Sequence, residues 1–168
     1  ALLRDLRGQK EVTIPDGVQM IGEHWFENTD IESVEIPASV REIGSEAFKG
    51  CTRLRRVEFK LDAVPSAVAA SMSEIVSGGS ESQPGESRLR TIESYAFCGC
   101  RSRRGIQFPD GLETIGICCF SYSGLEELVL PPGVREIRCG AFSYCDRLRR
   151  VRLNEGLERL NAEETVDG

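Results

Sequence analysis

Residues 36–59 read IPASVREIGSEAFKGCTRLRRVEF, and residues 130–153 read LPPGVREIRCGAFSYCDRLRRVRL. Two further stretches follow the same order of apolar and glycine positions: IPDGVQMIGEHWFENTDIESVEI from Ile14 and FPDGLETIGICCFSYSGLEELVL from Phe108. One unit is therefore repeated along the chain. A repeat of this length cannot bury its apolar face alone, so the pattern predicts similar coils stacked into a solenoid.

The spacing of the repeated apolar residues gives the length of the unit. The phenylalanines are Phe26, Phe48, Phe97, Phe120 and Phe142, at intervals of 22, 49, 23 and 22 residues. The matching aliphatic residues are Ile21, Ile43, Ile92, Ile115, Ile137 and Leu160, at intervals of 22, 49, 23, 22 and 23 residues. The interval of 49 holds one unit plus 26 or 27 extra residues. We therefore predict coils of 22 to 23 residues, with an insertion between Phe59 and Leu89.

Four stretches also carry the pattern L-x-x-L-x-L, which at a period of 20 to 29 residues is typical of a leucine-rich repeat. Its apolar positions are Ile31/Val34/Ile36, Leu54/Val57/Phe59, Leu125/Leu128/Leu130 and Leu148/Val151/Leu153. The alternation of the last two positions predicts a short strand that pairs in parallel with the next coil. We expect each repeat phenylalanine to fill the interior of its coil and to stack on the next one.

The units IP-x-x-V-x-x-IG-x-x-AF-x-x-C-x-x-L-x-x-V resemble the bacterial-surface-protein-A (BspA-like) class of leucine-rich repeats. The resemblance covers roughly residues 9–160, apart from the insertion. It implies a solenoid with cell-surface, host-contact or protein-binding roles and no shared catalytic residues. The third unit departs from the pattern, because Arg103 stands where other units carry Leu54 and Leu148, and because it lacks the Pro-x-Gly turn. We expect its strand to be distorted.

The whole chain, residues 1–168, is predicted to form a single solenoid whose two ends are covered in different ways. Residues 1–8 are expected to be a degenerate N-terminal coil or cap, and Trp25 is expected to cover that end of the stack. Residues 161–168 are polar, and we expect them to close or fray the C-terminal end.

The insertion, residues 60–87, has two halves. The first half places four apolar side chains on one face of a predicted short helix: Val64, Val68, Met72 and Ile75. The second half, SGGSESQPGES, has the composition of a flexible linker. Three interpretations are open: the helix packs on the solenoid, it docks a partner, or the segment is disordered.

Composition excludes several classes of function. The net charge of −6 and the pI near 5.0 argue against a general nucleic-acid binder, which needs a basic face. No window approaches 18 uninterrupted apolar residues, so no transmembrane segment is predicted. The single histidine, His24, and the lack of a nucleophile elbow or phosphate loop predict no metal site, no cofactor and no enzymatic activity.

Most of the seven cysteines are expected to be structural. Cys51, Cys100 and Cys145 follow the repeat phenylalanine by three residues, where other units carry Thr29 and Ser123. This position predicts a ladder of small side chains that form weak hydrogen bonds inside the coils. A disulfide between Cys51 and Cys100 is geometrically possible, because their coils are adjacent.

Cys98 differs from these, because it aligns with positions expected to be exposed. It is therefore the candidate for a reactive or intermolecular thiol. The odd number of cysteines favours a reducing intracellular or organellar compartment. A surface or secreted location, which the resemblance implies, is the alternative.

Charged residues at the outward strand positions change sign from coil to coil. The candidate protein-binding residues are Glu32, Glu35, Arg55, Arg56, Glu126, Glu127, Arg149, Arg150 and Arg152. One interpretation is that neighbouring strands pair their charges on a solvated face. The other is that the striped face recognises a partner of matching charge.

The sequence therefore predicts a non-enzymatic protein–protein interaction module that binds protein partners through the charged strand face, the insertion, or both. A structural accessory subunit of a larger multiprotein complex is the first alternative. A fragment of a surface or secreted adhesin is the second, and it comes from the resemblance alone.

Overall fold

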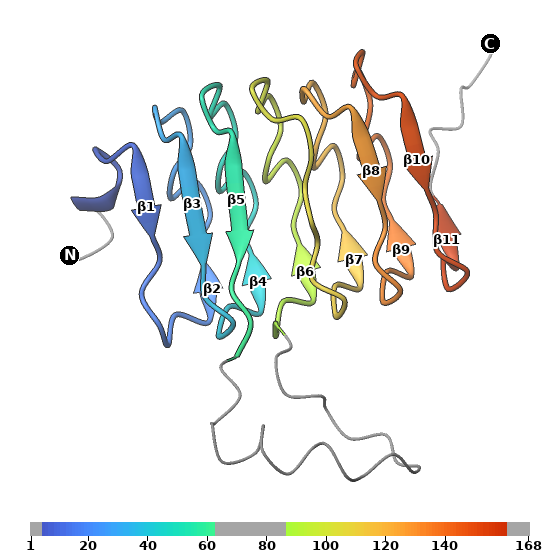
Figure 1. The fold of residues 1–168 in the computed structure, drawn as a ribbon, viewed down its shortest axis with the longest axis horizontal. Helices are drawn as coiled ribbons and strands as arrows, with labels where there is room; N and C mark the ends of the chain where they lie inside the picture. The colour runs from blue at the N-terminus through green and yellow to red at the C-terminus, as the bar shows by residue number, and fades with distance from the viewer. Residues whose placement is uncertain (1–4, 63–86, 161–168) are drawn as a thin grey trace, which may run out of the picture.

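The computed structural model describes residues 5–62 and 87–160 as one stack of coils (Figure 1). Most coils contribute a strand to the front of the stack and a shorter strand to a rear sheet, and every strand pair is parallel. The front strands are β1 (Glu11–Thr13), β3 (Ser33–Ile36), β5 (Arg56–Phe59), β8 (Glu127–Val129) and β10 (Arg150–Arg152). The rear strands are β2 (Met20–Ile21), β4 (Glu42–Ile43), β6 (Thr91–Ile92), β7 (Thr114–Ile115), β9 (Glu136–Ile137) and β11 (Arg159–Leu160). The predicted leucine-rich-repeat solenoid is confirmed.

The repeat phenylalanines form a continuous stack through the interior, as expected. Neighbouring rings lie 5.2, 5.1, 5.3 and 5.5 Å apart between centroids and are parallel to within 7°. The turns that carry them are joined from coil to coil by backbone hydrogen bonds; for example, the amide of Phe26 donates to the carbonyl of Ala47 at 2.8 Å. Because the amides of Phe48, Phe97 and Phe120 make the same bond to the next coil, these bonds hold the rings in register.

The expected ladder of small polar side chains lies next to this stack. The Cys51 thiol donates to the Phe26 carbonyl at 3.0 Å, and the Cys100 thiol donates to the Phe48 carbonyl at 3.3 Å. Cys145 makes the same contact with the Phe120 carbonyl at 3.2 Å. The part of the chain that the structure describes contains no disulfide, so Cys51 and Cys100 are not linked to each other. Each thiol instead satisfies a carbonyl of the preceding coil.

The insertion leaves the stack and returns to it at neighbouring points. The amide of Lys60 donates to the Ile36 carbonyl at 2.8 Å, and the amide of Arg88 donates to the Ala38 carbonyl at 3.0 Å. Arg88 also lies 3.7 Å from the carboxylate of Asp62. The expected helix of Val64, Val68, Met72 and Ile75 lies outside the described residues.

The front sheet breaks at the third unit, whereas the rear sheet does not. The front strands form two sheets, ordered β1-β3-β5 and β10-β8, and residues 104–108 between them form no strand. The rear strands stay in one sheet, ordered β11-β9-β7-β6-β4-β2. The expected distortion of the third strand is confirmed. Its physical causes are Gly105, which weakens a strand, and a buried charge at Arg103.

At the N-terminal end, Leu6 and Trp25 are partly buried against the core. The Trp25 ring covers the space beside Gly22 that a larger side chain would need. At the C-terminal end, β11 continues the rear sheet, while every residue of β10 is exposed.

Candidate protein-binding face

The structure places the predicted charged residues on and beside the front strands. Three of the four predicted acidic residues have ion-pair partners, whereas Glu127 has none within 4.0 Å among the described residues. Glu32 pairs with Lys10 at 3.6 Å, Glu35 with Lys60 at 3.7 Å, and Glu126 with Arg104 at 3.8 Å. The five predicted arginines form no ion pair within 4.0 Å among the described residues: Arg55, Arg56, Arg149, Arg150 and Arg152.

Charge pairing between strands therefore accounts for only part of this face. Arg150 lies opposite Glu127 in the register of β8 and β10, yet the two side chains make no ion pair. Glu35 lies opposite Glu58, and Lys60 bridges these like charges, at 3.7 and 2.9 Å respectively. The Lys60 ammonium lowers the pKa of Glu58 by hydrogen bonding to its carboxylate. Among the described residues, most of the charged side chains on this face that have no ion pair are thus arginines, although the chain as a whole is acidic.

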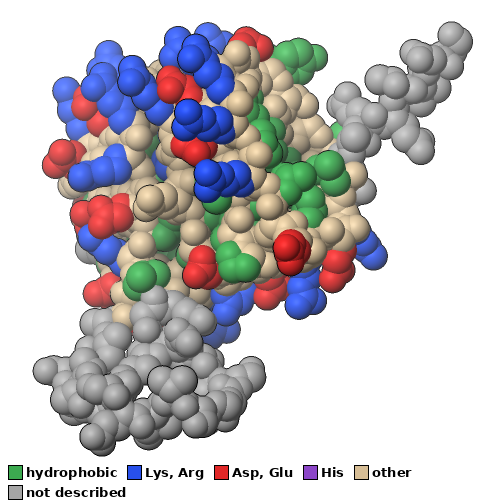
Figure 2. All heavy atoms as spheres, turned by 45° about the vertical axis from the view of Figure 1, so that its right-hand side comes forward, with side chains coloured by type: hydrophobic (Ala, Val, Ile, Leu, Met, Phe, Trp, Pro, Cys, Tyr) green, Lys and Arg blue, Asp and Glu red, His purple; other side chains and the backbone are tan. Residues whose placement is uncertain are grey.

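Arginines also gather at the loops that precede the front strands. Arg55, Arg101, Arg104 and Arg147 line a hollow of about 660 Å³, which we call the arginine edge. Figure 2 shows the blue Lys and Arg side chains concentrated along the upper part of the molecule. Arg104 is paired there with Glu126, but the other three have no carboxylate partner among residues 5–62 and 87–160.

The break in the front sheet opens a second hollow, of about 880 Å³, on the strand face. We call it the central groove; it is lined by residues 55–58, 103, 105–108, 110, 127 and 129–132. Its apolar lining includes Val57, Ile106 and Leu130. Arg55 and Gly105 line both hollows, so the central groove runs into the arginine edge.

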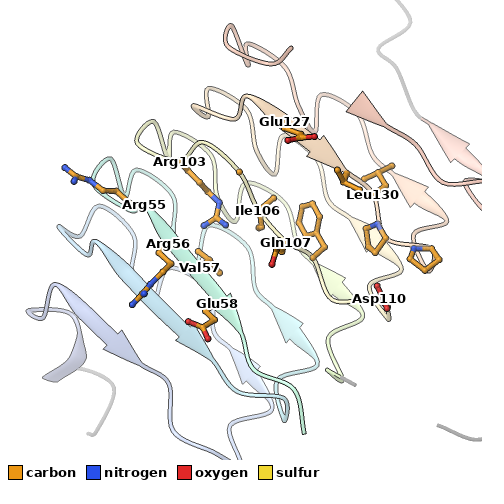
Figure 3. A pocket seen from close by; sticks show the side chains of 15 residues that line it. Arg55, Arg56, Val57, Glu58, Arg103, Ile106, Gln107, Asp110, Glu127 and Leu130 are labelled. Carbon is orange, nitrogen blue, oxygen red and sulfur yellow. The ribbon is translucent and has the colours of Figure 1, made fainter. Parts of the chain in front are cut away.

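Arg103 is the unusual residue of the central groove. Its side chain points from the third unit into the space between β5 and the segment of Ile106 and Gln107 (Figure 3). It is only 2% exposed, and its Nε and Nη1 atoms have no hydrogen-bond partner among the described residues. Burial lowers the pKa of this guanidinium to about 10, with the nearby Cys100 thiol opposing the shift weakly. A buried charge without a partner is costly, so the groove presents an unsatisfied cation.

Sequence reasoning identified Arg103 only as a departure from the repeat, and it did not include this residue among the candidates. The signal was present, because a charged residue in a leucine position of a regular repeat needs either a partner or a function. The burial of Arg103 could not be predicted from the sequence, because Arg101 and Arg104 beside it in the chain are exposed.

Cys98, the candidate thiol, is half-buried rather than exposed. It lines a hollow of about 370 Å³ together with Tyr95, Cys118, Tyr122 and other residues of the turn segments. Burial raises the pKa of Cys98, which disfavours the thiolate. The exposure of this repeat position varies from coil to coil, because the aligned Ser121 is buried whereas the side chain of the aligned Lys49 is 38% exposed.

The turn segments also bring together groups that the sequence left separate. The exposed rings of Tyr122 and Tyr144 stack at 4.6 Å. His24 Nδ1 lies 2.9 Å from Oε2 of Glu27 and 3.6 Å from Oε2 of Glu46, so three side chains of the kind that can bind a metal lie close together. The ammonium of Lys49 already donates to Glu46 at 2.7 Å, which supplies a cation to this cluster.

The chain belongs to the BspA type leucine-rich repeat family. Six copies of the family's repeat match residues 4–74 and 82–164. This membership agrees with the observed solenoid and with the resemblance of the repeat units. Repeats of this kind commonly serve as non-enzymatic scaffolds that present an extended surface to other proteins.

Solved structures show the same fold. The T. pallidum leucine rich repeat protein TpLRR is 35% identical, with 88% of this chain and 59% of that chain covered and a TM-score of 0.68. A leucine-rich repeat protein from Bacteroides ovatus is 26% identical, with 90% and 36% covered and a TM-score of 0.68. A leucine rich cell surface protein from Faecalibacterium prausnitzii is 24% identical, with 89% and 37% covered and a TM-score of 0.57; this likeness concerns the fold alone.

The chain spans less than two thirds of the length of each of these proteins. No curated protein matches the sequence. Within residues 5–62 and 87–160, no helix has the length and apolar character needed to cross a membrane.

Proposed function

We propose that this chain is a non-enzymatic protein-interaction module that binds its partner through the front-strand face. The observation that carries the proposal is a set of exposed arginines on this face that have no ion-pair partner within residues 5–62 and 87–160: Arg55, Arg56, Arg149, Arg150 and Arg152. Unpaired charges at an extended surface steer and select a partner of opposite charge.

The partner is a protein rather than a nucleic acid, for two reasons. The chain carries a net charge of −6, which opposes binding to a phosphate backbone. The lining of the central groove also combines the exposed apolar side chain of Val129 with charged residues, and such a mixed surface suits a polypeptide.

Affinity capture from extracts of the source organism, followed by mass spectrometry, tests the proposal with four baits. The first is the whole chain. The second carries Arg149→Glu, Arg150→Glu and Arg152→Glu on the front face. The third, a matched control, carries Arg41→Glu, Arg135→Glu and Arg159→Glu beside the rear sheet, where these arginines are also exposed. The fourth replaces residues 63–86 with a short Gly-Ser linker.

We expect a fixed set of proteins that the front-face variant loses and the rear-face variant retains. Equal recovery with both variants would contradict binding through the front strands. Loss only with the fourth bait would assign docking to the insertion instead. Circular dichroism of each bait confirms that the solenoid is folded.

A further inference from the structure

We propose that the central groove holds a carboxylate of an acidic, partly apolar peptide segment, and that Arg103 is the residue that binds this carboxylate. The proposal rests on the protein-interaction function proposed above and names the chemistry of the partner. It starts from one feature of the described residues, which is a buried guanidinium without a partner at the break in the front sheet.

The stack itself does not require an arginine at this position. The equivalent residues of other coils are Leu54, which is fully buried, and Leu148, which packs against the core. Arg103 thus replaces an apolar contact with a desolvated charge. Most buried polar groups in proteins have a partner, so an unpaired one that faces a hollow indicates a ligand site.

The ligand chemistry follows from the guanidinium and its surroundings. A guanidinium is planar and donates parallel hydrogen bonds to a carboxylate. No carboxylate of the described residues takes that place: Glu58, Asp110 and Glu127 line the groove, but none forms an ion pair with Arg103 within 4.0 Å. Arg55, at the junction with the arginine edge, adds positive charge along the path of entry.

The rest of the groove favours a peptide over a sulfated polysaccharide. Val129, which lines the groove and is 44% exposed, offers apolar surface that a peptide side chain can cover and a polysaccharide sulfate cannot. The carboxylates of Glu58 and Glu127 would repel a dense polyanion, whereas a peptide with a single well-placed acid can avoid them. The groove therefore fits an acidic residue flanked by apolar ones.

The test uses a phage-displayed library of random dodecapeptides selected against the whole chain. Enriched peptides are synthesised with a fluorescent label, and their binding is measured by fluorescence anisotropy at physiological salt. The variants are Arg103→Leu, which restores the leucine of the other coils, and Arg135→Leu, which removes an exposed arginine beside the rear sheet. A heparin oligosaccharide serves as the polysaccharide probe.

We expect the enriched peptides to share an Asp or Glu next to apolar residues. Arg103→Leu should weaken their binding by about tenfold or more, because charge-assisted hydrogen bonds are lost. Arg135→Leu should leave binding unchanged. Changing the shared acid to its amide should cost as much as Arg103→Leu, and the two changes together should cost little more than either one.

Three outcomes would overturn the inference: enrichment of peptides without an acid, binding that is insensitive to Arg103→Leu, or binding of heparin through Arg103 without binding of any peptide. The selected peptides could instead lose binding to the front-face triple variant while they still bind the Arg103→Leu variant. In that case the proposed function stands and only this inference fails. If no peptide is enriched, the inference is overturned, and the capture experiment judges the proposed function separately.

Discussion

Phe48 and Phe97 are 49 residues apart in the sequence, yet their rings stack at 5.1 Å and 7°. This geometry matches that of Phe26 and Phe48, which are only 22 residues apart. The second and third coils are thus direct neighbours. The core is continuous across a long interruption in the sequence.

Removing a ring from this stack should destabilise the whole solenoid. We expect Phe97→Ala to lower the free energy of unfolding by about 3–5 kcal/mol, because a fully buried ring is replaced by a cavity. Urea denaturation followed by circular dichroism measures the loss. Tyr144→Ala is the control, since that ring is exposed. A loss below about 1 kcal/mol for Phe97→Ala would contradict a cooperative stack.

Replacing residues 63–86 with a four-residue Gly-Ser linker should preserve the fold. The two attachment points are already held by hydrogen bonds to Ile36 and Ala38. A shorter loop also costs less closure entropy, so stability should be unchanged or rise by about 1–2 kcal/mol. Thermal unfolding compares the two chains. Aggregation of the shortened chain, or a fall in its melting temperature, would show that the segment packs on the solenoid.

Arg103→Leu should stabilise the protein while it weakens ligand binding. Burial lowers the pKa of Arg103 from 12.5 to about 10, and a shift of this size corresponds to roughly 3 kcal/mol. Below pH 10 the Arg103 guanidinium is protonated in both the folded and the unfolded state. The cost of burying its charge is therefore fully present at neutral pH. It fades only as the pH rises from about 10 towards 12.5.

Urea denaturation at pH 7 measures this gain. Arg104→Leu is the matched control. Arg104 is next to Arg103 in the sequence but its side chain is exposed, so replacing it should change the free energy of unfolding little. Loss of stability in the Arg103→Leu protein would mean that the guanidinium has a partner that supports the fold.

The free energy of unfolding should fall in alkaline solution, because the buried thiols of Cys100 and Cys119 resist ionisation in the folded protein. Burial raises the pKa of Cys119 and Cys100 above the usual 9.0. The unfolded chain ionises first, so the stability contributed by the neutral thiols is complete below pH 9 and is lost as the pH rises.

Cys119→Ala isolates this effect, because Ala47 and Ala141 occupy the same position in other coils. We expect the variant to lose less stability between pH 8 and pH 10 than the natural chain in parallel urea titrations. Identical pH profiles would show that the thiol ionises equally well in both states.

The sequence by itself determined the architecture. A period of 22 to 23 residues leaves few ways to bury its apolar positions, so Ile43, Phe48 and Leu54 had to face inward. The same periodicity located the insertion and placed Cys51 and Cys100 in a hydrogen-bonded ladder. Repetition made these predictions secure, because each coil repeats the same local packing.

Tertiary structure alone decided what the charged face offers. The sequence placed Glu126 and Arg149 on one surface. Only the spatial arrangement showed that Glu126 pairs with Arg104, whereas Arg149 has no ion-pair partner in the part of the chain that the structure describes. It also showed that Arg103 lies inside a groove instead of on the surface. Repeat periodicity assigns a residue to the inner or the outer side of a coil, whereas ion pairing and burial depend on distances between coils, which are set only when the coils stack.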